Sequence, residues 1–229
     1  VGAFRAQEPR SLAGKLLRLD PATGRGLADN PFYTGDPDTL ESRLWARGLR
    51  NPFRFTLVPG TGPREALFVC DVGHSTWEEL DLVRGGENFG WPCHEGAPEF
   101  AEYQANDPDG YCDALGPLSA PWLAWNHDLP GALGFTGRAA TGACVYDGND
   151  YPVAWRGGLF FCDFGAGWLR VAYFDQALQR TGVRAFATAL GSPIDLVRHP
   201  GNGDLVYTTL EAGEHRILRL RYAPANRAP

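Results

Sequence analysis

An arginine and an asparagine stand together at a proline corner in the segment RGLRNPFRF, residues 47–55. Pro52 disfavours helical backbone at Asn51 and fixes the turn, so the side chains of Arg50 and Asn51 project from a rigid corner. A fixed guanidinium beside an amide suits an anionic, planar ligand. The same side chains could instead serve the fold by binding loop carbonyl groups, and local chemistry leaves both roles open.

Two neighbouring glutamates, Glu78 and Glu79, begin the apolar segment EELDLV, residues 78–83. Because successive side chains of a strand point to opposite faces, only one of the two is expected to face solvent. The other must turn inward, and a buried carboxylate needs a cationic partner. The alternative is a solvated edge strand that binds no cation.

The chain has five cysteines, and Cys93 and Cys112 enclose a loop with almost no strand or helix periodicity. A disulfide there would stabilise the fold by about 3 kcal/mol and would indicate an oxidising compartment. Two free thiols in a reducing compartment are the alternative. Cys70 and Cys162 occupy matching places in the similar segments LFVCDVG and LFFCDFG, so both are expected to be buried. Cys144 lies one predicted strand from Cys162 and could pair with it.

Three segments share a strand-turn-strand pattern, a third strand follows each of them, and the first two also have a fourth strand. The strand-turn-strand segments are residues 53–73, 143–165 and 194–213. The third strands are expected at 78–83, 167–175 and 215–222, and the fourth strands at 122–128 and 183–190. This repeated module, with its Gly and Pro corners, predicts an all-β fold. A β-propeller of four-stranded antiparallel blades fits it better than an ordinary antiparallel sandwich.

Residues 14–20 and 42–50 are predicted to form two outer strands whose inner partners are missing, so the chain would hold roughly three and a half blades. A propeller must close, because each blade buries its faces against two neighbours. The chain also contains no methionine, and so no initiator. We therefore expect residues 1–222 to be part of a larger propeller, with a disulfide-closed insertion at 93–137. Residues 223–229 have no periodicity and are expected to form a linker. The resemblance of this tail to that of secreted bacterial proteins implies that the linker leads to a further domain.

Composition narrows the class of protein. The formal net charge of −6 and the isoelectric point near 5.4 argue against a nucleic-acid-binding surface. No uninterrupted apolar run approaches the roughly 20 residues of a transmembrane helix. The 29 glycines and 18 prolines agree with many short strands joined by turns.

Several long motifs follow one another in a distinctive order: SLAGKLLRLDPATGRG, NPFYTGDPDTLESRLWARGLRNPFRF, DVGHSTWEELDLVRGGENFGWPCHEG, GNDYPVAWRGGLFFCDFGAGWLRV and PIDLVRHPGNGDLVYTTLEAGEHRILRLRY. In these motifs nearly the whole chain resembles the soluble glucose/sorbosone dehydrogenase family. The resemblance implies a six-bladed β-propeller, of which this chain is the C-terminal half. It also implies an oxidoreductase that oxidises the CH–OH group of aldose sugars to lactones. The implied cofactors are pyrroloquinoline quinone and Ca²⁺, the implied partner is a small-molecule sugar, and the implied location is extracellular or periplasmic.

The resemblance assigns roles to particular residues. Arg50 and Asn51 match a pair that contacts the quinone, and Gly73 matches a turn whose backbone carbonyls face the cofactor-linked calcium. Glu79 and Phe89 match a structural calcium pair, one through its carboxylate and the other through its backbone oxygen. Hard oxygen donors of this kind suit Ca²⁺.

The sequence also departs from the family pattern. The general-base histidine of the family lies upstream of this chain, so we expect no catalytic residue here and no activity from this chain alone. A lysine and two arginines that surround the quinone in bacterial members are replaced by Gly165, Ser192 and Ile194. Each missing charge-assisted contact is worth about 1.5–3 kcal/mol. The histidines present match no family motif and are expected at the surface: His74, His94, His127, His199 and His215.

The alternative function is a non-catalytic extracellular β-propeller that binds carbohydrate or protein. Aromatic residues of the insertion could stack on sugar rings, or could equally pack the insertion itself; they are Tyr103, Tyr111, Trp122 and Trp125.

Overall fold

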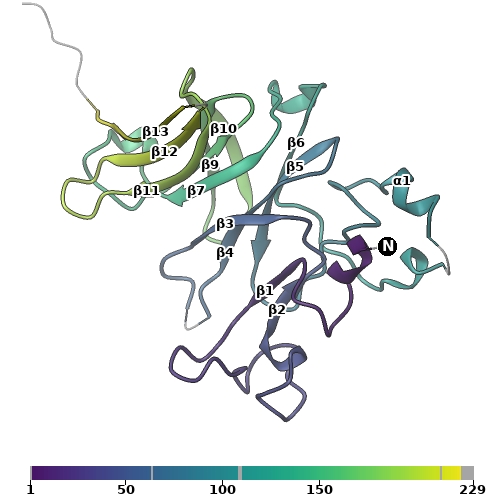
Figure 1. The fold of residues 1–229 in the computed structure, drawn as a ribbon. Coiled ribbons are helices and arrows are strands. Elements are labelled where there is room, and N and C mark those ends of the chain that lie inside the picture. The colour runs from purple at the N-terminus through teal and green to yellow at the C-terminus, as the bar shows by residue number, and fades with distance from the viewer. Residues whose placement is uncertain (1, 63, 108–109, 212, 223–229) are drawn as a thin grey trace, which may run out of the picture. The chain divides into compact units, whose positions relative to one another are not determined.

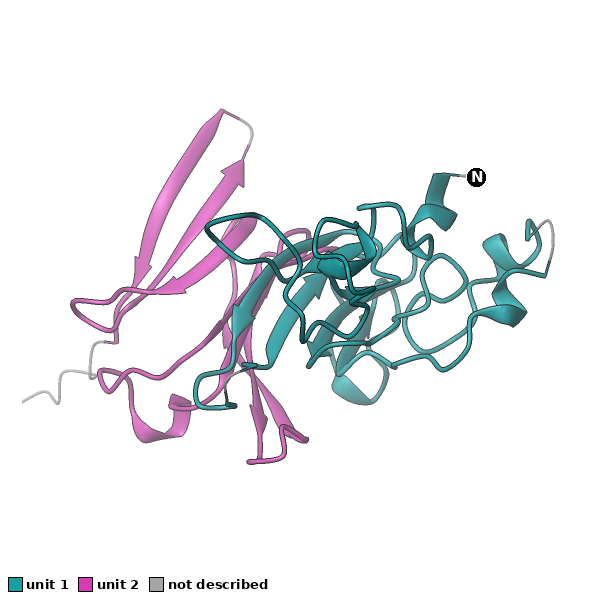
Figure 2. Cartoon of the chain, turned by 90° about the horizontal axis from the view of Figure 1, so that it is seen from below, with its two compact units in different colours: residues 1–138 teal, residues 139–229 magenta. Residues whose placement is uncertain are grey.

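The computed structural model describes residues 2–62, 64–107, 110–211 and 213–222. The regular secondary structure of the described residues is mostly β-strand (Figure 1), and their one α-helix, α1 (Ala101–Gln104), spans four residues. It divides into two compact units, unit 1 (residues 1–138) and unit 2 (residues 139–229), which are coloured separately in Figure 2. Among the described residues, no helix is both long enough and apolar enough to span a membrane.

Unit 1 contains a two-stranded sheet, β1-β2, and a four-stranded sheet, β3-β4-β5-β6. Both sheets are antiparallel, and each strand pairs with its neighbour in the chain. The strands are β1 (Lys15–Leu17), β2 (Leu44–Arg47), β3 (Pro52–Leu57), β4 (Leu67–Asp71), β5 (Trp77–Val83) and β6 (Leu123–Asn126). Short 3-10 helices lie at Gly2–Ala6, Glu41–Arg43, Cys112–Ala114 and Gly131–Leu133.

Unit 2 contains a four-stranded sheet, β7-β8-β9-β10, and a three-stranded sheet, β11-β12-β13. These sheets are antiparallel as well. The strands are β7 (Ala140–Val145), β8 (Leu159–Asp163), β9 (Trp168–Phe174), β10 (Arg180–Ala187), β11 (Pro193–Arg198), β12 (Leu205–Glu211) and β13 (Glu214–Leu220). A 3-10 helix lies at Val153–Trp155.

These sheets confirm the predicted fold class of four-stranded antiparallel propeller blades. Each predicted fourth strand is the outer edge of a four-stranded sheet, as β6 and β10. The expected outer pair of an incomplete blade is the β1-β2 sheet. The predicted extents 1–222 and 93–137 remain predictions, and the predicted linker, 223–229, lies outside the described residues.

The core of unit 1 lies between the two sheets, β1-β2 and β3-β4-β5-β6. Trp45 of β2 packs with Leu67 and Val69 of β4 and with Val83 of β5, and Phe89 completes the cluster. Burial of such a side chain stabilises a fold by roughly 1.5–3 kcal/mol. The β4 and β5 side chains of this cluster share one face of the four-stranded sheet, because positions two apart in a strand point the same way.

The predicted disulfide is present, with the Cα atoms of Cys93 and Cys112 5.5 Å apart. The suggested pairing of Cys144 with Cys162 is wrong, because both are free thiols buried in the core of unit 2. The register of β7 and β8 explains this: Cys144 pairs with Phe160, and Cys162 pairs with Gly142, so the two cysteines are not opposite each other. Cys70 is a thiol as well, and it is fully buried, as expected.

Candidate cation and cofactor site

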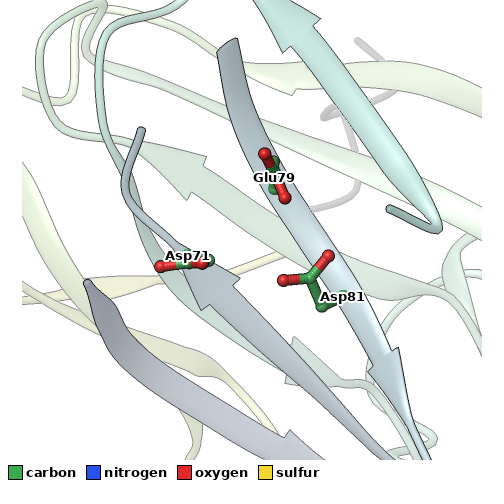
Figure 3. A group of neighbouring side chains, drawn as sticks. All are labelled: Asp71, Glu79 and Asp81. Carbon is green, nitrogen blue, oxygen red and sulfur yellow. The ribbon is translucent and has the colours of Figure 1, made fainter. Parts of the chain in front are cut away.

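Three carboxylates meet at the end of the unit 1 core (Figure 3). Asp71 ends β4 and pairs directly with Glu79 of β5, while Asp81 pairs with Val69. All three therefore continue the face that carries Val69 and the other core residues. One oxygen of each carboxylate lies within 4.8 Å of the others.

This acid cluster, defined as Asp71, Glu79 and Asp81, is removed from solvent. The residues are 4%, 8% and 0% exposed. Neither carboxylate oxygen of Asp81 has a hydrogen-bond partner among the described residues. Glu79 Oε1 accepts a hydrogen bond of 2.5 Å from the Gly96 N–H. A buried acid with no donor must be neutralised, either by a proton or by a bound cation.

The pKa values show the cost of holding these charges together. Burial raises the pKa of Asp71 to about 7, although the amides of Arg50 and Asn51 act in the opposite direction. Burial, followed by the charge of Asp71, raises the pKa of Glu79 to about 8. Burial and the charge of Glu79 raise the pKa of Asp81 well above its ordinary value. Burial and mutual repulsion therefore favour the protonated forms of the three acids, and a bound divalent cation would favour their ionised forms instead.

A small cavity is lined by two members of this cluster, Asp71 and Glu79, and by residues expected from the sequence, while Asp81 is not part of its lining. The cavity has a volume of about 10 Å³, counted as the space that the centre of a water molecule can occupy. It therefore has room for one ion or one water molecule. Four of the five sequence-predicted site residues line it, namely Arg50, Gly73, Glu79 and Phe89, together with Asp71. Asn51, the fifth, has an exposed side chain and is not part of the lining.

The Arg50–Asn51 corner is fixed by Asp71. The backbone N–H of Arg50 donates to Asp71 Oδ2 at 2.8 Å, and that of Asn51 donates to Asp71 Oδ1 at 2.6 Å. The Arg50 guanidinium donates to the Val72 carbonyl at 2.9 Å and lies 5.5 Å from the centre of the Trp91 ring. One guanidinium nitrogen thus fills the structural role left open by the sequence, the other lies 3.4 Å from His74 Nδ1, and the residue as a whole is half-buried.

The loop of residues 73–77 connects β4 to β5 and depends on a glycine. A Cβ atom at Gly73 would lie 1.6 Å from the Trp77 carbonyl oxygen, so no larger residue fits this turn. Glu78 Oε2 accepts a hydrogen bond of 3.1 Å from the Gly73 N–H. His127 Nε2 lies 2.8 Å from Glu78 Oε1, and the backbone N–H of His127 donates a hydrogen bond to the Thr76 carbonyl.

Two expectations from the sequence are therefore wrong. Glu78 and Glu79 are both buried, at 0% and 8% exposure, although one was expected to face solvent. The reason is that side chains on both faces of β5 are buried. Glu78 lies beside Trp125, its partner in β6, and its carboxylate contacts His127. His127 is no surface histidine, because its side chain is 8% exposed and contacts Glu78.

The aromatic residues of the insertion mainly pack the protein. Trp125 is 1% exposed and lies 6.2 Å from Phe135, and Trp122 packs 4.6 Å from Phe68, both measured between ring centres. Tyr103 and Tyr111 each make an edge contact with Phe4. The buried Trp125 therefore presents no open face for stacking on a sugar, whereas Trp122 is half-buried and Tyr111 is 37% exposed.

Sequence reasoning missed Asp71, Asp81 and Glu95. A pattern could have revealed the two aspartates, because Asp81 interrupts the apolar segment LDLV and Asp71 ends the apolar segment LFVCD. Glu95 follows Cys93 in an irregular segment, where no periodicity predicts the direction of a side chain.

The residues present fit a calcium ion better than they fit the whole quinone. Carboxylate and carbonyl oxygens are the ligands that Ca²⁺ takes, and the partnerless oxygens of Asp81 are available to it. For an anionic quinone the corner offers one guanidinium. Gly165 lies in the turn between β8 and β9, Ser192 precedes β11, and Ile194 lies within β11, so these positions supply no cation.

Comparisons with known proteins agree with this architecture. The Glucose / Sorbosone dehydrogenase family model matches residues 3–219. The HIPL1 protein of Arabidopsis thaliana is 33% identical over 163 residues, which are 64% of this chain and 22% of that protein. A structure described as a glucose dehydrogenase has a TM-score of 0.74 and 24% identity, and the match covers 97% of this chain and 58% of that chain.

A second structure is the PQQ-bound form of an aldose sugar dehydrogenase from Streptomyces coelicolor, with a TM-score of 0.67 and 21% identity. That match covers 95% of this chain and 54% of the other. These two likenesses show the fold. The chain spans 22% of the HIPL1 protein and little more than half of each of the two structures.

Proposed function

Because the chain belongs to the glucose/sorbosone dehydrogenase family, we propose that it forms part of a quinone-dependent oxidoreductase acting on aldose sugars. The reaction converts the CH–OH group of the sugar to a lactone. One observation carries the proposal: the carboxylate of Asp71 belongs to the acid cluster and also fixes the backbone of Arg50 and Asn51. The cofactor corner and the cation site therefore form one unit.

Each residue has a task in this function. Arg50 binds a carboxylate of pyrroloquinoline quinone, and Asn51 and the Gly73 carbonyl position the same cofactor and its metal. When bound, the quinone supplies the two-electron acceptor for the hydride that leaves the sugar. Glu79 and the Phe89 carbonyl hold Ca²⁺, and Asp71 and Asp81 complete its oxygen ligands. We assign no proton transfer to a residue of this chain.

The disulfide supports an oxidising location, extracellular or periplasmic. The competing function is a non-catalytic propeller that binds carbohydrate or protein, and the absence of cations at Gly165, Ser192 and Ile194 favours it.

One experiment separates the two functions. The full-length protein, of which this chain is proposed to form part, is purified and supplied with Ca²⁺ and pyrroloquinoline quinone, and the reduction of an artificial dye is measured with a panel of aldoses. We expect sugar-dependent dye reduction that is lost when the quinone is omitted. Absence of both quinone binding and dye reduction would assign the protein to the non-catalytic class.

A further inference from the structure

Glu95 contacts the 73–77 loop in an unusual way. Its Oε1 atom accepts hydrogen bonds from four consecutive backbone amides, those of His74, Ser75, Thr76 and Trp77, at 2.7, 2.8, 2.9 and 3.1 Å. Consecutive N–H groups that converge on one oxygen form an anion-binding nest. The side chain of Glu95 thus supplies the anion that this loop requires.

The other oxygen of Glu95 has no such role. The residue is 3% exposed, and Oε2 is buried without a hydrogen-bond partner among the described residues. Glu95 also lines the small cavity together with Asp71, Glu79 and Phe89. After burial and the charge of Asp71, the charge of Glu95 is a further cause that raises the pKa of Glu79.

A cation accounts for all of these features together. A buried carboxylate oxygen without a donor costs free energy, and an acidic neighbour such as Glu79 increases that cost. The cavity has room for one ion. A cation there would contact Glu79 on β5 and Glu95 on the insertion, which are 16 residues apart in the chain.

We infer that Glu95 joins the cation to the 73–77 loop, with Oε2 as a metal ligand and Oε1 as the anchor of the loop amides. The inference rests on the proposed cation site. Its consequence is that occupation of the site by Ca²⁺ orders the loop that carries Gly73. Glu95 is therefore a positioning residue for the cofactor corner, because it acts through the loop.

The test measures calcium binding and loop order separately in the purified protein without quinone. Calcium affinity is measured by calorimetry for wild type, Glu95→Gln and the matched control Glu99→Gln, which removes one negative charge from an exposed neighbour. Loop order is measured by hydrogen–deuterium exchange of the amides of residues 74–77, with and without Ca²⁺. We expect Glu95→Gln to weaken calcium binding by about 10- to 100-fold, as loss of a metal-site partner usually does. Glu99→Gln should bind as wild type.

In wild type, Ca²⁺ should slow exchange of these four amides, and in Glu95→Gln this response should be lost. If Glu95→Gln binds calcium as tightly as wild type, the inference is overturned and the proposed cation site stands. If wild type binds no calcium, both are overturned. If Glu95→Gln fails to fold, the exchange measurement on wild type decides. Slower exchange of the 74–77 amides with Ca²⁺ supports the inference, and unchanged exchange contradicts it.

Discussion

Asp71 shows how one side chain can serve two neighbours. Its two oxygens accept hydrogen bonds from the backbone N–H groups of Arg50 and Asn51, while its position opposite Glu79 places it in the acid cluster. The corner is therefore rigid before any ligand arrives, which lowers the entropic cost of binding. The Arg50 guanidinium is held by the Val72 carbonyl, the Trp91 ring and the neighbouring His74 ring.

We predict that Arg50→Ala weakens quinone binding by about 1.5–3 kcal/mol, which is roughly 10- to 150-fold, the usual loss for a charge-assisted contact. Fluorescence titration of the calcium-loaded full-length protein, of which this chain is proposed to form part, with pyrroloquinoline quinone measures the affinity. Arg54→Ala is the matched control, because Arg54 lies four residues further along the chain in β3, is exposed and does not line the cavity. Unchanged affinity in Arg50→Ala would remove the cofactor role from this corner.

The partnerless oxygens of Asp81 lead to a prediction about calcium. Asn keeps the shape of Asp81 and removes its charge, and no donor hydrogen bond is lost. Because burial and neighbouring charge raise the pKa of Asp81, ionisation of this carboxyl opposes calcium-free folding at neutral pH, and the calcium-free stability of Asp81→Asn should be higher than that of wild type. Wild type should gain about 2.7 kcal/mol when calcium is about one hundred times its Kd, and Asp81→Asn should gain much less. Thermal unfolding with Ca²⁺ and with a chelator measures both. Asp113→Asn, an exposed change, should respond as wild type, and an equal response in Asp81→Asn would exclude this residue as a ligand.

Cys162 gives a prediction at alkaline pH. Burial raises its pKa from 9.0 to about 12, so the unfolded chain loses the thiol proton first. The contribution to stability is complete below pH 9 and is lost as the pH rises toward 12. Above pH 9 the slope approaches about 1.4 kcal/mol per pH unit for this thiol. Urea unfolding at pH 9 and pH 10.5 should show a smaller fall for Cys162→Ala than for wild type, and equal falls would contradict the shift.

At the scale of elements, β4 and β5 carry most of the site. Their shared face begins with Leu67 and Val83 in the core and ends with Asp71 and Glu79. The backbone amides of residues 73–77, between these strands, donate hydrogen bonds to the carboxylates of Glu78 and Glu95. The β4-β5 pair is therefore fixed at its apolar end by the core, and its acidic end is the part whose stability should change when a ligand binds.

The insertion depends on its covalent link. Cys93 and Cys112 close a loop with a sequence separation of 19, and reduction should cost about 3 kcal/mol on the chain-entropy model. We predict three titratable thiols after denaturation without reductant, those of Cys70, Cys144 and Cys162. In the native protein at pH 8 these buried thiols should not react. Five thiols after denaturation would exclude the disulfide.

At the scale of the whole molecule, each unit has its own core, and all members of the acid cluster belong to unit 1. The calcium ligands therefore need no residue outside unit 1. A quinone with several carboxylates needs more cations than Arg50 provides, and the family positions at Gly165, Ser192 and Ile194 supply none.

We therefore predict that a protein made of residues 1–229 alone binds Ca²⁺ but shows no measurable affinity for the quinone. Calorimetry with Ca²⁺ and fluorescence quenching by pyrroloquinoline quinone measure the two ligands on the same sample. Glu79→Gln is the control that should lose the calcium signal. Tight quinone binding by residues 1–229 would show that the missing cations are not required.

The sequence by itself determined the strands, the turns, the disulfide and the rigid corner. These features depend on local chemistry: alternation of apolar side chains, Gly and Pro at turns, and a proline after Asn51. Repetition of the LFVCDVG pattern was enough to indicate blades, because each blade uses the same local solution.

Only the tertiary structure decided which side chains meet. The register of β4 against β5 places Asp71 beside Glu79, and a shift by one residue would have sent these acids to opposite faces. Glu78 is buried because Trp125 and His127, more than 40 residues later in the chain, lie beside its side chain. Glu95 reaches the 73–77 loop because the insertion folds back, and no local pattern encodes that return. Proximity across strands and loops is set by register and packing, which a single sequence does not display.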